Sequence, residues 1–301
     1  MTWMNPGRTL RRALVGVGLL AAPASAQQMP PGVGLSTRAG VYEKVSETTA
    51  SGTVTYLRRW TRTQPREVLD RTERIIERSE LGSVGADLEA RYRPVLDAIG
   101  WVKPMGCTAT HIGQGLVLTA QHCFTDRPLT GTVNQPCDGV TIQWGYREGA
   151  GPALVSRCEV ILAAEFSDTR DFALLRVSPV PAAHVTVSPS PRPAPGTRLT
   201  LFSHPRGRPL EWSGTCALRP ALDGGYTSRA MFTHQCDTEP GSGGAAVLND
   251  ETLQIVGIHG GGEITEVNKD NRPVGWNFAT FLSDIPLPPE ALPQAPKKQK
   301  P

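Results

Sequence analysis

Hydrophobic positions after about residue 97 fall in short runs rather than in long helical periods. Examples are "VTIQW", "FALLRV", "RLTLF" and "QIVGIHG", which carry many β-branched or aromatic residues. Clusters of Gly, Pro and Asp separate these runs. Many short strands joined by turns predict an all-β fold, either a sandwich or a pair of barrels.

The pattern before residue 97 is different. Residues 64–80 have apolar positions near helical spacing among alternating Glu and Arg, which predicts an exposed amphipathic helix. A second helical piece is expected within residues 85–100. We therefore predict a partly helical N-terminal extension over residues 27–96. It is either a pro-segment, released by cleavage near Arg91 or Arg93, or a permanent subdomain, and the sequence leaves both open.

The two ends of the chain have their own composition. A basic start, the apolar run "ALVGVGLLAAP" and the closing "ASA" predict a signal peptide over residues 1–26 and a secreted or periplasmic protein. The alternative, an amphipathic helix on a cytosolic protein, has less support. No other segment is apolar enough to cross a membrane. Residues 285–301 are rich in Pro and Lys and predict a disordered tail, which leaves 97–284 as the main domain.

Composition narrows the class of protein. The net charge of +3 over 301 residues is too small to indicate a nucleic-acid partner. Six cysteines, an even number, lie after residue 100, which fits disulfide formation in an oxidising compartment. The sequence contains no Cys-x-x-Cys pair, which a structural zinc site would commonly use, and we expect no metal or cofactor. Of the pairings that six cysteines allow, we prefer the sequential one: Cys107–Cys123, Cys137–Cys158 and Cys216–Cys236.

Three segments carry candidate chemistry. "LVLTAQHC" holds His122, "DFALLRV" holds Asp171 and "PGSGG" holds Ser242. Serine hydrolysis needs a hydroxyl that attacks, an imidazole that takes its proton and a buried carboxylate that orients the imidazole. Asp171 precedes an apolar run and is preferred to Asp168. Each signal is weak alone, but the three in this order predict a serine hydrolase.

At these segments the chain resembles the trypsin-like (chymotrypsin-fold) serine proteases, and most closely the bacterial glutamyl endopeptidase group. "CTATHIGQGLVLTAQHC", "DFALLRV" and "LFSHPRGRP" are similar to family segments, and the likeness covers residues 97–284. It implies two antiparallel six-stranded β-barrels with His122 as general base, Asp171 as its orienter and Ser242 as nucleophile. The protein would be a secreted endopeptidase acting on protein or peptide substrates, and we expect a monomer.

The resemblance also implies a specificity pocket. Within "QIVGIHGGG", His259 matches the histidine that contacts an acidic substrate side chain in the glutamyl group. Thr238, Gly260 and Gly261 would complete this site. Two alternatives stay open: His259 fills the inner face of a strand, or Asp237 attracts Arg or Lys instead.

The loop before Ser242 departs from the family pattern because Pro240, which has no N–H, stands where an oxyanion donor is expected. We interpret this as a missing residue, so that Gly241 and Ser242 supply the two amides of the oxyanion hole. In the other interpretation the shortened loop spoils this geometry, and the protein is an impaired protease that binds peptides or a partner. A third hypothesis is an esterase that uses the same triad.

Overall fold

The computed structural model describes residues 35–36, 40–49, 52–60, 81–124, 130–167, 169–187, 192–219, 230–267 and 273–292. The predicted signal peptide, the helix expected at 64–80 and Asp168 lie outside these described residues.

Six strands of the first half close into an antiparallel barrel. Their order around the ring is β11-β7-β6-β5-β9-β10, and β10 pairs with β11 to close it. The strands are β5 (Ile99–Lys103), β6 (Cys107–Gly113), β7 (Leu116–Thr119), β9 (Thr141–Trp144), β10 (Leu154–Phe166) and β11 (Asp171–Ser178). A further strand, β8 (Thr130–Pro136), pairs with β10 outside the ring.

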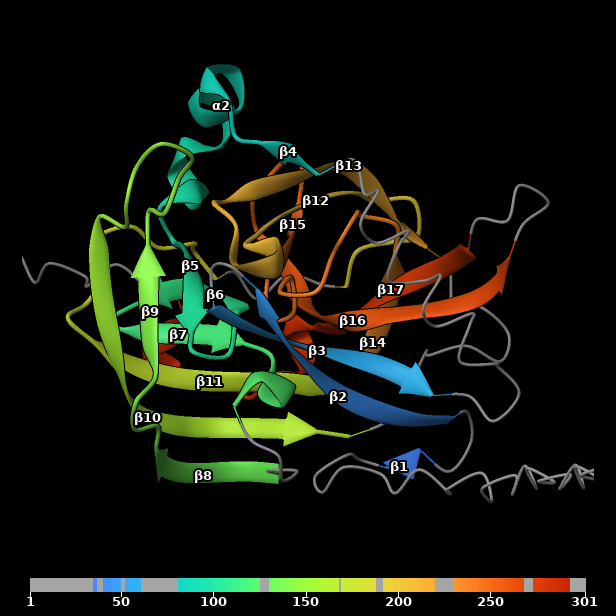
Figure 1. The fold of residues 1–301 in the computed structure, drawn as a ribbon, viewed down its shortest axis with the longest axis horizontal. Helices are drawn as coiled ribbons and strands as arrows, with labels where there is room; N and C mark the ends of the chain where they lie inside the picture. The colour runs from blue at the N-terminus through green and yellow to red at the C-terminus, as the bar shows by residue number, and fades with distance from the viewer. Residues whose placement is uncertain are drawn as a thin grey trace, which may run out of the picture.

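The second half forms another closed antiparallel ring, in the order β16-β15-β12-β13-β14-β17. The strands are β12 (Arg198–Ser203), β13 (Glu211–Arg219), β14 (Met231–His234), β15 (Ala246–Asn249), β16 (Ile255–Val267) and β17 (Pro273–Phe281). The predicted pair of six-stranded antiparallel barrels is thereby confirmed (Figure 1).

The helix α2 (Ala86–Leu96) and the short strand β4 (Gly82–Ser83), which pairs with β13, precede the barrels. Tyr92, Val95 and Leu96 are buried in the core cluster that also contains side chains from both barrels. The Tyr92 ring packs edge-on against Phe202 with 5.0 Å between centroids. α2 therefore packs into the core of the barrels, and the extension over residues 27–96 as a separate unit stays a prediction.

A strand hairpin lies further towards the N-terminus, where the sequence analysis expected no strands. β2 (Gly40–Thr49) pairs antiparallel with β3 (Gly52–Trp60), and the short β1 (Leu35–Ser36) pairs with β2. β3 pairs with β16 through Arg58 and Gly262. Figure 1 shows this hairpin in blue, running across the front of the molecule.

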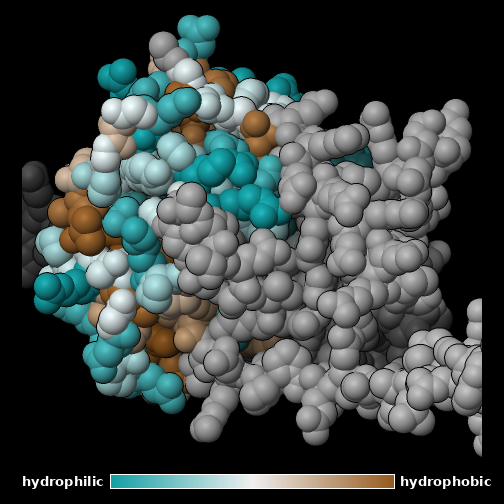
Figure 2. Space-filling model, viewed as in Figure 1, coloured by the Kyte–Doolittle hydropathy of each residue, from teal (hydrophilic) through white to brown (hydrophobic). Residues whose placement is uncertain are grey.

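Four 3-10 turns complete the described elements. They are η1 (Gln121–Cys123), η2 (Pro205–Gly207), η3 (Leu282–Asp284) and η4 (Pro289–Ala291). Ile285 and Ala291 lie in the core, so residues 285–292 pack on the domain rather than belonging to the predicted tail. The coloured part of the face in Figure 2 mixes hydrophilic and hydrophobic residues. Within the described ranges, no helix has the length and apolar composition that crossing a bilayer requires.

Three disulfide bonds join the cysteines in sequential order: Cys107–Cys123, Cys137–Cys158 and Cys216–Cys236. Cys107 begins β6 and Cys123 ends η1, so the first bond fixes the turn that follows β7 to the neighbouring strand.

Candidate active site

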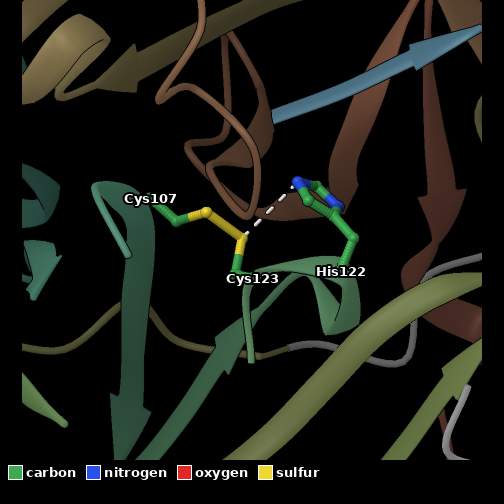
Figure 3. A group of neighbouring side chains, drawn as sticks. All are labelled: Cys107, His122 and Cys123. Carbon is green, nitrogen blue, oxygen red and sulfur yellow. Dashed lines mark hydrogen bonds between the residues drawn. A yellow bond between two sulfur atoms is a disulfide. The ribbon is translucent and has the colours of Figure 1, made fainter. Parts of the chain in front are cut away.

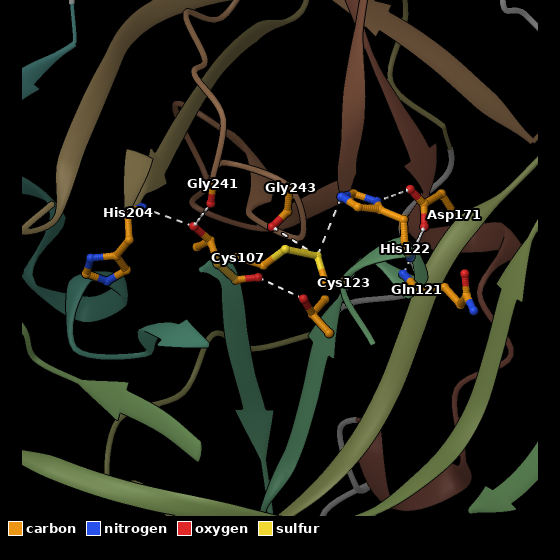
Figure 4. The surroundings of a disulfide bond; sticks show 10 residues. Cys107, Gln121, His122, Cys123, Asp171, His204, Gly241 and Gly243 are labelled. Carbon is orange, nitrogen blue, oxygen red and sulfur yellow. Dashed lines mark hydrogen bonds and ion pairs between the residues drawn. A yellow bond between two sulfur atoms is a disulfide. The ribbon is translucent and has the colours of Figure 1, made fainter. Parts of the chain in front are cut away.

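His122 and Asp171 form a buried pair. His122 stands in η1, directly after β7, and Asp171 opens β11, which pairs with β7. The His122 Nδ1 atom lies 2.7 Å from Asp171 Oδ2, and both side chains are 1% exposed. The other carboxylate oxygen accepts the Gln121 N–H at 2.8 Å and the His122 N–H at 3.3 Å (Figure 4). This arrangement orients an imidazole as a general base requires.

The second imidazole nitrogen has no oxygen or nitrogen partner among the described residues. The Nε2 atom of His122 lies 3.6 Å from Cys123 Sγ, a half-cystine sulfur that is at best a weak partner (Figure 3). The His122 ring is therefore oriented by Asp171, but its Nε2 atom contacts no hydroxyl in the part of the chain that the structure describes.

The Ser242 hydroxyl is directed elsewhere. It lies 3.0 Å from Ser203 Oγ and accepts the Glu239 N–H at 3.2 Å, and Ser242 is fully buried. The structure thus brings together two of the three predicted catalytic residues and joins the third to a different group. The predicted nucleophile contacts Ser203 instead of His122.

Gly243 is the residue that faces the base. A Cβ atom built on Gly243 would lie 2.8 Å from both Cε1 and Nε2 of His122. The Gly243 carbonyl accepts the Thr108 N–H at 2.9 Å, which holds this point of the loop against β6. The sequence predicts that Ser242 meets the imidazole, whereas the backbone path places Gly243 next to it.

The same backbone path decides which amides could bind an oxyanion. The Ser242 N–H donates to the Glu239 carbonyl at 2.9 Å, so it is not free for this role. The N–H groups of Gly241 and Gly243, which flank it, donate no hydrogen bond to any described backbone or side-chain acceptor. The amides without a bond are thus those of Gly241 and Gly243, whereas the predicted oxyanion pair is Gly241 and Ser242.

Gly241 is required at its position. Its φ is +100°, and a Cβ there would lie 2.8 Å from the backbone of both His204 and Arg206. The Arg206 N–H donates to the Pro240 carbonyl at 2.6 Å, and Glu239 pairs with Arg206 and Arg208. These contacts fasten the oxyanion loop to η2 and give Pro240 an acceptor role that needs no N–H.

Sequence comparison places this site in a known family. The family profile described as trypsin-like peptidase domain matches residues 107–258, slightly more than half of the chain. The chain belongs to the trypsin-like peptidase family. The predicted family of serine proteases is confirmed at this level, whereas the glutamyl endopeptidase subgroup stays a prediction. No curated protein sequence matches the chain.

Solved serine proteases resemble the trypsin-like domain at low identity. The Rv3671c protease of M. tuberculosis in its active form has 16% identity and a TM-score of 0.44, over 67% of this chain and 85% of that one. The inactive form of the same protease has 15% identity and a TM-score of 0.43, over 67% of this chain and 93% of that one. The serine endoprotease of Yersinia pestis has 14% identity and a TM-score of 0.44, over 64% of this chain and 61% of that one.

The predicted specificity residues lie in the second barrel of the trypsin-like domain. His259 is 3% exposed, and its Nδ1 lies 3.3 Å from His234 Nε2. Burial lowers the pKa of His259 well below its usual value, so the ring is neutral. His259 is thus buried against His234, and its contact with an acidic substrate side chain stays a prediction. Thr238 Oγ1 donates to Asn277 Oδ1 at 3.0 Å.

Gly260 stands close to the catalytic pair. A Cβ on Gly260 would lie 3.2 Å from Asp171 Oδ2 and 2.9 Å from the Phe278 ring. Gly261 and Gly262, which follow along β16, are half-buried. β16 therefore passes directly beside Asp171 and leaves no room there for a larger side chain.

Two groups in the trypsin-like domain place a histidine beside two cysteines, as in some metal sites. They are Cys107 with His122 and Cys123, and Cys216 with His234 and Cys236. Each cysteine pair is a disulfide, so neither group offers a thiolate ligand. Neither has the donor set of a zinc site.

Proposed function

We propose that this trypsin-like domain binds an extended polypeptide in the cleft between its barrels without hydrolysing it. The observation that carries the proposal is that Gly243, which has no side chain, faces the nitrogen of the oriented base. This corresponds to the impaired-protease alternative of the sequence analysis.

In a competent site the nucleophile lies within hydrogen-bond reach of its base, at about 2.6–3.2 Å. Gly243 supplies no hydroxyl. The Ser242 hydroxyl is on the other face of the loop, where Ser203 and the Glu239 N–H bind it. Removing the serine of a protease triad lowers turnover by about 10⁶-fold, and what remains comes from the oxyanion hole and substrate binding. We therefore expect no hydrolysis of peptides on a biological timescale.

The parts that hold a polypeptide are retained. The Gly241 and Gly243 amides are free to bind a carbonyl oxygen. β16 runs past Asp171 and extends beyond its pairing with β15, which ends at Ile258. An extended chain can add to such an edge through main-chain hydrogen bonds.

Export is part of the proposal. Three disulfides fit an oxidising compartment, and the predicted signal peptide supplies a route to it. We propose a periplasmic or extracellular location and a monomeric chain.

Peptide hydrolysis through Ser242 is the second candidate. The intact His122–Asp171 pair and membership of a protease family favour it. It requires the loop to turn so that Ser242 gives up its contacts with Ser203 and Glu239.

A cleavage assay separates the two candidates. Wild type and Ser242→Ala are incubated with an unfolded protein and with a small activated ester, and products are followed by mass spectrometry and absorbance. The proposal predicts no peptide cleavage and equal ester rates. Cleavage by wild type that Ser242→Ala abolishes would establish the second candidate. Binding is measured by fluorescence anisotropy of labelled peptides on the full chain and on a chain that begins at residue 81.

A further inference from the structure

The edge of β16 beside the catalytic pair is open within the barrel itself. β15 pairs with β16 only from Ile255 to Ile258, whereas β17 pairs along the other side as far as Val267. The His259 backbone still bonds Gly244 and Ala245, directly before β15, and beyond His259 neither neighbour in the ring covers this side of β16. An unpaired strand edge of this kind is a template for another extended segment.

The β2–β3 hairpin already takes this edge. β3 pairs with β16 in the parallel sense through Arg58 and Gly262. β3 also contacts η1, the turn that carries His122, and η2, which is fastened to the oxyanion loop. The hairpin therefore spans the distance from the β16 edge to the catalytic base.

The site is closed in the whole chain. His122 is 2% exposed, Ser242 is fully buried, and Gly241 and Gly243 are buried as well. A base and an oxyanion loop that served a free substrate would need access from solvent.

We propose that the hairpin Gly40–Trp60 is a built-in ligand that occupies the polypeptide-binding edge of β16. The inference rests on the proposed function, which assigns polypeptide binding to this edge, and it adds that the hairpin is the segment bound there. Both barrels close through their own strands, so the hairpin is an addition outside the rings. Residues 61–80 connect it to β4, which gives it enough chain to leave without opening a barrel.

The form of the pairing suits an occupant that can be displaced. β3 and β16 share a single paired position, whereas β2 and β3 pair along their whole length. Parallel pairing is also slightly less stable per residue than antiparallel pairing. The hairpin can thus detach as one unit and expose the edge to another polypeptide.

Hydrogen exchange on the full chain and on a chain that begins at residue 81 tests this inference. The shorter chain retains α2 and both closed rings, and unchanged exchange in β6 and β11 shows that it is folded. We expect exchange at residues 260–262 to be at least about tenfold faster in the shorter chain. A synthetic peptide of residues 40–60, but not a scrambled one, should restore the protection.

A matched pair of full-length variants makes the same test without truncation. Arg58→Pro removes a backbone N–H from β3 and disfavours its pairing, whereas Arg58→Ala keeps the backbone unchanged. Arg58→Pro should expose residues 260–262, and Arg58→Ala should not. Equal protection of these residues in the full and shortened chains would overturn the inference. That result would leave the cleavage assay, and with it the absence of hydrolysis, unaffected.

Discussion

Placing a hydroxyl opposite His122 should convert the domain into a hydrolase. The substitution is Gly243→Ser, which adds a side chain at the position whose Cβ would face Nε2 and Cε1 of the imidazole at 2.8 Å. The Asp171 contact and the free amides of Gly241 and Gly243 are already in place.

The size of the gain follows from two opposing contributions. A complete triad contributes about 10⁶-fold over the same site without its serine. Against this, a Cβ at 2.8 Å is closer than van der Waals contact, so the imidazole must retreat by roughly 0.7 Å. Overpacking of this kind costs about 1–3 kcal/mol, which is about 5-fold to 150-fold in rate. We therefore expect ester hydrolysis to rise by about 10⁴-fold to 10⁵-fold.

The assay compares Gly243→Ser with Gly243→Ala, which adds the same Cβ without a hydroxyl. Both are made in the full chain and in the chain that begins at residue 81, because the hairpin lies over the site. Hydrolysis of an activated ester and labelling by a fluorophosphonate should appear in Gly243→Ser only. If the folded serine and alanine variants behave alike, position 243 is not the position of the nucleophile.

Three further predictions concern stability. Tyr92→Phe removes the 2.6 Å hydrogen bond to the buried Asp250 and should lower the free energy of unfolding by about 1.5–3 kcal/mol. Burial raises the Tyr92 pKa to about 12, so absorbance titration of the variant should lack the ionisation near pH 12. Wild type should lose this stabilisation as the pH rises from 10 to 12. Burial lowers the His234 pKa to about 3, because the buried ring resists protonation. The free energy of unfolding should therefore be highest above pH 6.5 and should fall as the pH drops towards 3. His234→Leu should flatten this dependence in urea unfolding at pH 7 and pH 4. Replacing Cys107 and Cys123 together by serine should lower the free energy of unfolding by about 3 kcal/mol, since the bond closes a loop of 16 residues. An unchanged urea midpoint would contradict the prediction for this variant, and likewise the one for Tyr92→Phe.

The fold could be predicted because its determinants are local. Short apolar runs between turn residues indicate strands, and the structure contains them at "VTIQW", "FALLRV" and "RLTLF". His122 follows such a run and Asp171 begins another, so pairing of β7 with β11 brings them together. The helix within residues 85–100 was also predicted from the pattern.

Features that depend on distant contacts could not be predicted in the same way. Whether Ser242 or Gly243 meets the imidazole depends on how Glu239, Pro240 and η2 hold the loop. The burial of α2 depends on Asp250, which lies 158 residues after Tyr92. The β2–β3 hairpin lies within the N-terminal extension that the sequence analysis expected to be partly helical.

The reaction of the wild-type chain with a fluorophosphonate tests the central claim most directly. The intact mass should remain unchanged after prolonged exposure, while Gly243→Ser gains one adduct under the same conditions. An adduct on wild type that peptide mapping assigns to Ser242 would contradict the claim that the residue opposite the base carries no nucleophile.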